Sequence, residues 1–119
     1  MLDNILEMAE ALGKQIYDSN LYQSYLYYKN KVENKTDLQQ KIDTLKKMQL
    51  SQGIRRRQGE IVPLEEEEAL SQVYSEVALD KDGLGFWESE KQLLLFMAEV
   101  LEIVTQQAPV DFHYAEEME

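Results

Sequence analysis

The chain has 119 residues, no cysteine and a formal net charge of −11, so we expect one domain without disulfides, thiolate metal sites or thiol catalysis. Residues 1–62 carry ten Lys/Arg against eight Asp/Glu, whereas residues 63–119 carry two against fifteen, and this acidity opposes direct binding to nucleic acid or anionic membranes. The longest apolar run, residues 93–98, is far shorter than the about 20 residues of a membrane span, and the N-terminus lacks the basic region of a secretory signal.

Most of the sequence is rich in Leu, Glu, Gln, Lys and Ala, which favours helices, and strand-like alternation is absent. The first helix is predicted over residues 3–18. One face of it carries an apolar stripe made of Ile5, Ala9, Leu12 and Ile16. Gly13 lies inside this helix, where it costs about 1 kcal/mol relative to alanine, so we expect another helix to approach closely there.

A second helix is predicted from the cap signal at Ser19-Asn20 to about Glu33. It contains four tyrosines within seven residues, among them Tyr22, Tyr25 and Tyr28. Tyrosines at helical spacing favour a core or interface face whose hydroxyls reach the rim. The sharper alternative is a tyrosine-lined ligand cage, which would make the protein a small-molecule sensor.

The third and fourth helices are predicted to form a long hairpin. A capping box at Thr36 opens the third helix, and Pro63 is suited to the first position of the fourth. Apolar residues stop before the hairpin tip, where Arg55, Arg56 and Arg57 should meet Glu65, Glu66, Glu67 and Glu68 across the hairpin. We interpret these seven residues as a partner-docking tip with a basic and an acidic edge; the alternative is that both runs are simply solvated.

The fifth helix is predicted over residues 86–106, after a turn at residues 80–85. Its apolar side chains cover an arc of about 220°, whereas a surface helix needs little more than 100°. The surplus predicts a central helix that also forms an oligomer interface, with core and interface residues Phe86, Trp87, Leu93, Phe96, Met97, Val100, Leu101 and Val104. Glu90 lies within the arc and needs a hydrogen-bonding partner: the first turn of the same helix, a tyrosine hydroxyl or a cation from another chain. We interpret it as a satisfied bond between helices or between subunits.

No residue pattern points to catalysis, a cofactor or a bound metal. His113 is the only histidine, and it lies in the acidic tail predicted to follow the helical domain of residues 1–107. Residues 80–85 resemble the start of a calcium loop, but Lys91 occupies the position of the closing glutamate. We therefore predict that the protein is not an enzyme and carries no catalytic, cofactor-binding or metal-binding residue.

The order of these features resembles the YlbF/YmcA family of small helical bacterial regulators, which includes YheA-type members. The resemblance covers about residues 5–106 and is carried by residues 12–25, 37–42, 59–68 and 86–100. It implies a cytoplasmic, non-enzymatic regulator that assembles with itself or with related chains. Some members are associated with competence, sporulation, biofilm formation and RNA processing. Cysteine-bearing members are tied to iron–sulfur chemistry, which cannot extend to this cysteine-free chain.

Together these features predict an all-α protein of about five helices with a long helical hairpin, an open antiparallel bundle completed by oligomerisation. The predicted function is regulation through protein–protein contacts, with a homodimer as the expected assembly and other protein chains, including related family members, as further partners. A chaperone-like or structural module that grips unfolded chains is the alternative, beside the tyrosine-lined sensor. The family positions of Tyr22, Tyr25 and Glu90 are interpreted as structural.

Overall fold

The computed structural model describes residues 1–109 and contains five α-helices. Its elements are α1 (Leu2–Asp18), α2 (Asn20–Glu33), α3 (Thr36–Arg57), α4 (Leu64–Leu79) and α5 (Lys81–Gln107). No strand occurs in this part of the chain, so the predicted all-α fold with a long α3–α4 hairpin is confirmed. The predicted tail lies outside the described residues from residue 110 onward, and His113 with it.

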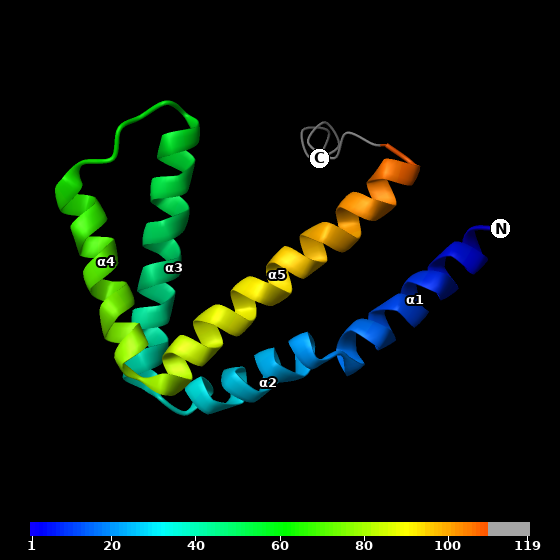
Figure 1. Ribbon diagram of the computed structural model, residues 1–119, viewed down its shortest axis with the longest axis horizontal. Helices are drawn as coiled ribbons and strands as arrows, with labels where there is room; N and C mark the ends of the chain where they lie inside the picture. Colours follow the sequence, from blue (N-terminus) through cyan, green and yellow to red (C-terminus); the bar gives the residue numbers. More distant parts are fainter. Residues whose placement is uncertain (110–119) are drawn as a thin grey trace.

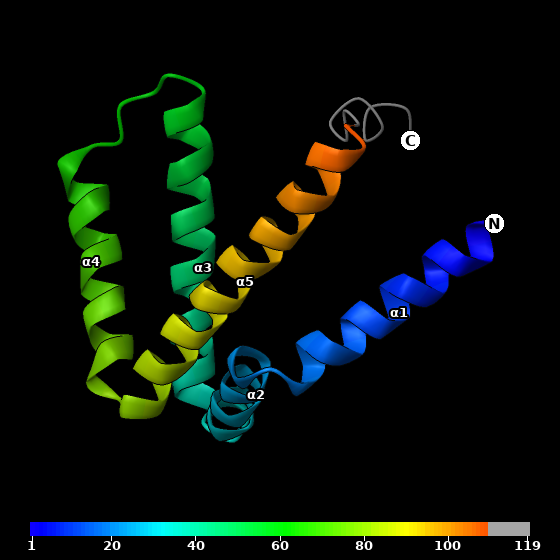
Figure 2. The ribbon, with the colours of Figure 1, turned by 45° about the vertical axis from the view of Figure 1, so that its right-hand side comes forward.

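The helices form two diverging arms that meet at one end of the molecule, which we call the vertex (Figure 1). One arm is the α3–α4 hairpin, and the other contains α5 with α2 beside it and α1 extending from the far end of α2 (Figures 1 and 2). The molecule measures 53 × 37 × 22 Å, with a radius of gyration of 17.9 Å. A compact domain of this length has a radius of about 13.5 Å, so the chain is open and elongated.

The hydrophobic core lies at the vertex, where α2, α3, α4 and α5 meet. Its buried members are Val32, Leu38, Ile42, Leu45, Val77 and Phe86. Tyr25, Tyr28, Tyr74 and Trp87 cover it as partly buried residues. The Tyr74 and Trp87 rings pack edge to face, with centroids 6.5 Å apart. This single cluster fixes the bases of both arms relative to each other.

Two glycines of α5 permit close approach at the vertex. A Cβ atom on Gly83 would lie 2.6 Å from the Val77 carbonyl oxygen, and one on Gly85 would lie 2.2 Å from a ring carbon of Tyr28. Neither space can hold a side chain without displacing its neighbour. Gly83 therefore allows α5 to lie directly against the end of α4, and Gly85 allows it to lie against Tyr28 of α2.

An ion-pair cluster closes the outer side of the vertex. The Lys35 ammonium lies 2.9 Å from the Asp80 carboxylate and 3.1 Å from that of Asp82. The Asp80 side chain also accepts hydrogen bonds from the backbone N–H groups of Asp82 and Gly83, so it caps α5. The two carboxylates raise the pKa of Lys35, and the bond from Lys35 lowers the pKa of Asp80.

The local start signals were correct at one helix and wrong at others. Ser19 caps α2 as predicted, since its hydroxyl accepts from the Tyr22 N–H. The capping box at Thr36 does not form: Lys35 is the N-cap of α3 and makes no side-chain cap. Pro63 is the N-cap of α4 and not its first residue, and the predicted turn at residues 80–85 shrinks to Asp80, because its carboxylate starts α5 at Lys81.

Candidate interaction surfaces

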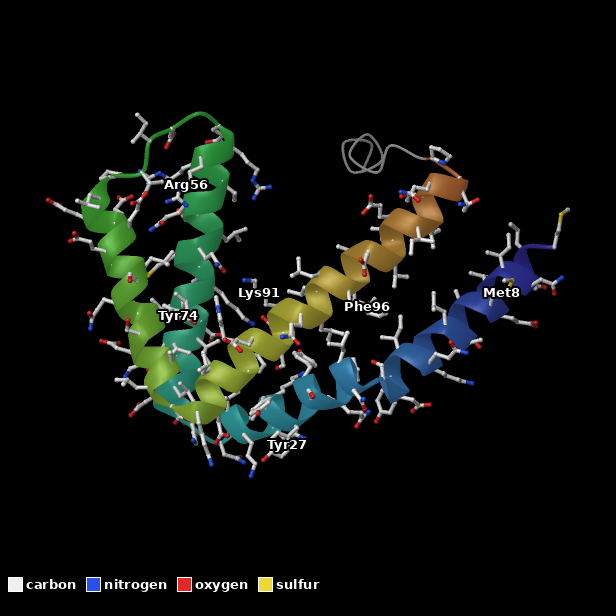
Figure 3. The ribbon with its side chains drawn as sticks, in the orientation of Figure 1. Met8, Tyr27, Arg56, Tyr74, Lys91 and Phe96 are labelled. Carbon is white, nitrogen blue, oxygen red and sulfur yellow. The ribbon has the colours of Figure 1, made fainter. Side chains whose placement is uncertain are left out.

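Ion pairs close the tip of the α3–α4 hairpin. Arg55 binds both Glu60 and Glu66, and the Arg56 guanidinium lies 2.9 Å from Glu67 (Figure 3). The structure thus brings together part of the predicted charge cluster. Arg57 instead donates to the Gly53 carbonyl oxygen of its own helix. The pairs Arg55–Glu66 and Arg56–Glu67 join α3 to α4 and hold the hairpin closed, and each of these partly exposed pairs contributes about 0–1 kcal/mol.

The loop that joins the two helices has a defined conformation. Gly59 has φ +85°, and the Glu60 N–H donates to the Arg55 carbonyl oxygen, which ends α3. Val62 turns inward and is only 5% exposed, and the buried Gln52 side chain donates to the Glu66 carbonyl oxygen. Two apolar side chains of this region remain exposed to solvent: Ile61 is 91% exposed and Leu64 67%.

The residues predicted for the face of α5 divide into two groups along the helix. Phe86 and Leu93 are buried, and Trp87, Phe96 and Val100 are half-buried. Met97, Leu101 and Val104 are 42–53% exposed. The predicted central position of α5 holds for its first half, which crosses the vertex and packs against α2, α3 and α4, whereas no residue after Leu93 is buried among those described.

The apolar stripe of α1 has little cover from the chain itself. None of its 17 residues is buried, and among the described helices α1 contacts only α2. Ile5 is 60% exposed and Leu12 40%. A Cβ atom on Gly13 would meet nothing within 4 Å, so the close helix approach predicted there does not occur within this chain.

The tyrosines of α2 form an aromatic row that leads from α1 to the vertex. Tyr22 stacks between Tyr17 and Tyr25, with ring centroids 5.2 and 5.9 Å away, and Tyr25 lies 5.9 Å from Phe86. Tyr28 fills the space beneath Gly85. Tyr22, Tyr25 and Tyr28 therefore pack against side chains and backbone of the same chain.

Glu90 binds a cation of its own chain. The Lys46 ammonium of α3 lies 2.8 Å from the Glu90 carboxylate and 5.1 Å from the centre of the Phe86 ring. The bond between helices that was expected for Glu90 is therefore present, but its partner is a lysine of the same chain and not a tyrosine hydroxyl or a cation of another chain. The ion pair bridges α3 and α5 where the two arms begin to separate.

A groove opens around this ion pair between α3 and α5. Its volume is about 550 Å³, and we call it the α3–α5 groove; it is lined by Lys46, Gln49, Leu50, Trp87, Glu90, Lys91, Leu94 and Leu95. Leu50, Leu94 and Leu95 are each 61–62% exposed. Lys91 lies on the side of α5 that faces α3 (Figure 3). Sequence reasoning missed the groove because leucines on two helices 44 residues apart give no joint signal.

Neither a metal-binding cluster nor a membrane-spanning helix occurs in the described residues. Within residues 1–109, no three His, Cys, Asp or Glu side chains are arranged to hold a metal ion. None of the helices in this range has the length and apolar character needed to cross a membrane. The notable features of the surface are therefore its apolar faces and their charged borders.

Comparisons with known proteins identify relatives over most of the chain. The family described as "Control of competence regulator ComK, YlbF/YmcA" matches residues 5–107. A UPF0342 protein of Caldicellulosiruptor saccharolyticus is 27% identical over 103 residues, which cover 87% of this chain and 86% of that protein. A UPF0342 protein of Caldicellulosiruptor bescii is 27% identical over 101 residues, which cover 85% of each chain. No solved structure matches significantly. Since the family match spans most of the chain, the protein belongs to the YlbF/YmcA family of regulators.

Proposed function

We propose that this protein is a non-enzymatic regulatory adaptor that assembles with itself through the apolar faces of α1 and α5. In this assembly, a homodimer in its simplest form, the α3–α4 hairpin tip projects outward and contacts a different protein. The regulatory role follows from family membership. Assembly and docking are the means by which we propose that the role is carried out.

The exposed apolar surface of the two terminal helices carries this proposal. Leu6 is 63% exposed on α1, and Leu101, Ile103 and Val104 are 53–59% exposed on α5. Most helical stability in proteins comes from the packing of an amphipathic face, and α1 gains little of this packing from its single neighbour. Large exposed apolar patches in soluble proteins mark contact with other molecules. A second copy would cover both faces.

The hairpin tip supports the second half of the proposal. Ile61 and Leu64 are exposed on a loop fixed by Gly59, Val62 and the Gln52 bond. A fixed loop loses little conformational entropy when it binds. Arg55 and Arg56 are engaged within the hairpin, so we assign them the role of holding the tip, and assign the contact to its apolar residues.

Self-assembly can be tested by light scattering over a dilution series. Val104→Glu places a charge on the exposed apolar face of α5 and should shift the protein to monomers. Gln106→Glu is the matched control, because Gln106 shares the polar face of α5 with Glu99 and Glu102 and should leave assembly unchanged. A wild-type protein that stays monomeric at tens of micromolar would contradict the proposed assembly.

The tip can be tested separately by affinity purification of regulatory partners from the native host. Ile61→Ser should reduce recovery of a specific partner without changing the oligomeric state. Leu79→Ser is the control, because Leu79 is 86% exposed but lies at the vertex, far from the tip. Equal recovery with both variants would remove the tip from the docking role.

A further inference from the structure

We propose that α1 of one copy lies in the α3–α5 groove of a second copy, so that two copies exchange their first helices. The inference rests on the proposed self-assembly and names the contact that makes it. It assigns both a receptor and an occupant, each formed by described residues of this chain. The assembly would contain two identical contacts related by a two-fold axis, as closed dimers require.

The groove has the form and chemistry of a helix-binding site. Its floor contains the half-buried Trp87, and Leu50, Leu94 and Leu95 are exposed along its walls. An amphipathic helix that lays its apolar face between two helices is a common mode of recognition. The volume of about 550 Å³ accommodates several side chains of such a helix.

The charge at the groove selects an acidic helix. Lys91 is one of only two cations after residue 62, in a chain whose net charge is −11. It lies on the side of α5 that faces α3, next to the Lys46–Glu90 pair (Figure 3). The three groups together carry a charge of +1. An approaching helix with acids beside its apolar face would meet this cation.

Helix α1 has the complementary features. Its four acids outnumber its single lysine, Lys14, and Glu10 lies at the edge of the apolar face beside Leu6, whereas Asp3 and Lys14 lie together on the opposite face. Gly13 lies within the stripe and has no neighbour within 4 Å, so the backbone is bare where a partner could approach closely. A receptor for this helix must therefore be apolar with a cationic border.

The occupant must come from a second copy. In its own chain α1 extends from the far end of α2, on the side of α5 away from α3, and it contacts α2 alone among the described helices (Figures 1 and 2). Its apolar stripe is thus unable to reach the α3–α5 groove of the same chain in this arrangement. A second copy supplies both a free α1 and a free groove.

Cysteine cross-linking can identify the contact, because the chain contains no cysteine of its own. Two differently tagged copies are mixed, one carrying Ala9→Cys in the apolar stripe of α1 and the other Leu95→Cys in the groove. Mild oxidation should join the two tags, since a disulfide needs Cα atoms within about 7 Å. Ala11→Cys, on the opposite face of α1, is the control and should give little product.

Two other outcomes would overturn the assignment. If Ala9→Cys joins Val104→Cys in place of Leu95→Cys, α1 packs on the far half of α5 of the partner, and self-assembly survives without the groove. If light scattering finds dimers but neither pair cross-links, α1 is not the occupant and the groove belongs to another helix. A protein that remains a monomer contradicts self-assembly itself, so the two failures are distinguishable.

Charge reversal gives an independent readout of the same contact. Lys91→Glu should weaken the dimer about fivefold in a dilution series at low salt, as the loss of an exposed ion pair predicts. Adding Glu10→Lys to the same chain should restore most of that affinity. A dimer unaffected by Lys91→Glu, or a double variant weaker than the single one, would contradict the pairing of α1 with the groove.

Discussion

The vertex and the two free helical segments use the same kinds of side chain with opposite results. At the vertex, Leu45 is 1% exposed and Val77 is completely buried, because four helices supply neighbours. Along α1 and the last part of α5, Leu6 and Leu101 are more than half exposed. Both regions come from amphipathic helices, so the difference lies in how many helices surround them.

This contrast separates two meanings of an apolar helix face. The pattern in the sequence indicates that the face needs cover, but it does not say whether the cover belongs to the same chain. In the vertex the cover is internal, and substitutions there should reduce the stability of each subunit. In α1 and the last part of α5, substitutions should instead change assembly.

The largest expected effect comes from truncating a leucine in each region. Leu45→Ala should lower the free energy of unfolding by about 2–5 kcal/mol, because it leaves a cavity in the core. Leu101→Ala should lower subunit stability by no more than about 1 kcal/mol and weaken self-association. Urea unfolding followed by fluorescence of Trp87, the single tryptophan, measures the first quantity. Similar losses of subunit stability in both variants would erase the contrast.

A smaller effect is expected from adding one methyl group at a glycine of each region. Gly83→Ala should destabilise the subunit by about 1–3 kcal/mol, since the new Cβ would meet the Val77 carbonyl oxygen and the Leu38 side chain. The new Cβ of Gly13→Ala would meet no neighbour. The substitution should therefore raise the helical content of α1 and stabilise the protein by about 0.5–1 kcal/mol. Circular dichroism thermal scans measure both. A stabilising Gly83→Ala would mean that the close approach at the vertex is absent in solution.

The smallest effect concerns the ion pairs that close the vertex. Asp80→Asn keeps a good helix cap and removes the attraction to Lys35. Because the pKa of Asp80 is lowered in the folded chain, its contribution is present above the ordinary value of about 3.9 and lost as the pH falls through the lowered pKa. Urea midpoints of the two proteins should therefore differ at pH 7 and converge below about pH 4. A constant difference would assign the effect to the cap alone.

Local signals in the sequence predicted much of the fold. The periodic apolar stripe defined α1, and Ser19 began α2 where the cap signal indicated. The Arg run at the end of α3 and the Glu run at the start of α4 predicted the hairpin correctly. Because few residues separate the two runs, they face each other when α4 folds back along α3. The cap signal at Thr36 failed because α3 begins one residue earlier than the signal requires. Thr36 is the first residue of the helix, and Lys35, which cannot accept a hydrogen bond through its side chain, is the N-cap.

Contacts between distant segments were beyond the sequence. The Lys46–Glu90 pair joins residues 44 apart, and Lys35 meets Asp80 45 residues away. Neither spacing carries a periodic signal, since both depend on how the two hairpin helices and α5 meet at the vertex. The excess apolar arc of α5 was visible, but its division into a buried first half and an exposed second half depends on where its neighbours end.

Because both arms meet at one end of the molecule, a small rotation there moves the far end of an arm by a larger distance (Figure 1). With 22 residues, α3 is about 33 Å long, so a rotation of about 10° at the vertex would carry the hairpin tip through about 6 Å. The same rotation changes the spacing at the base of the arms by far less. A partner that rotates one arm about the vertex when it binds between the arms would therefore also displace Ile61 at the hairpin tip.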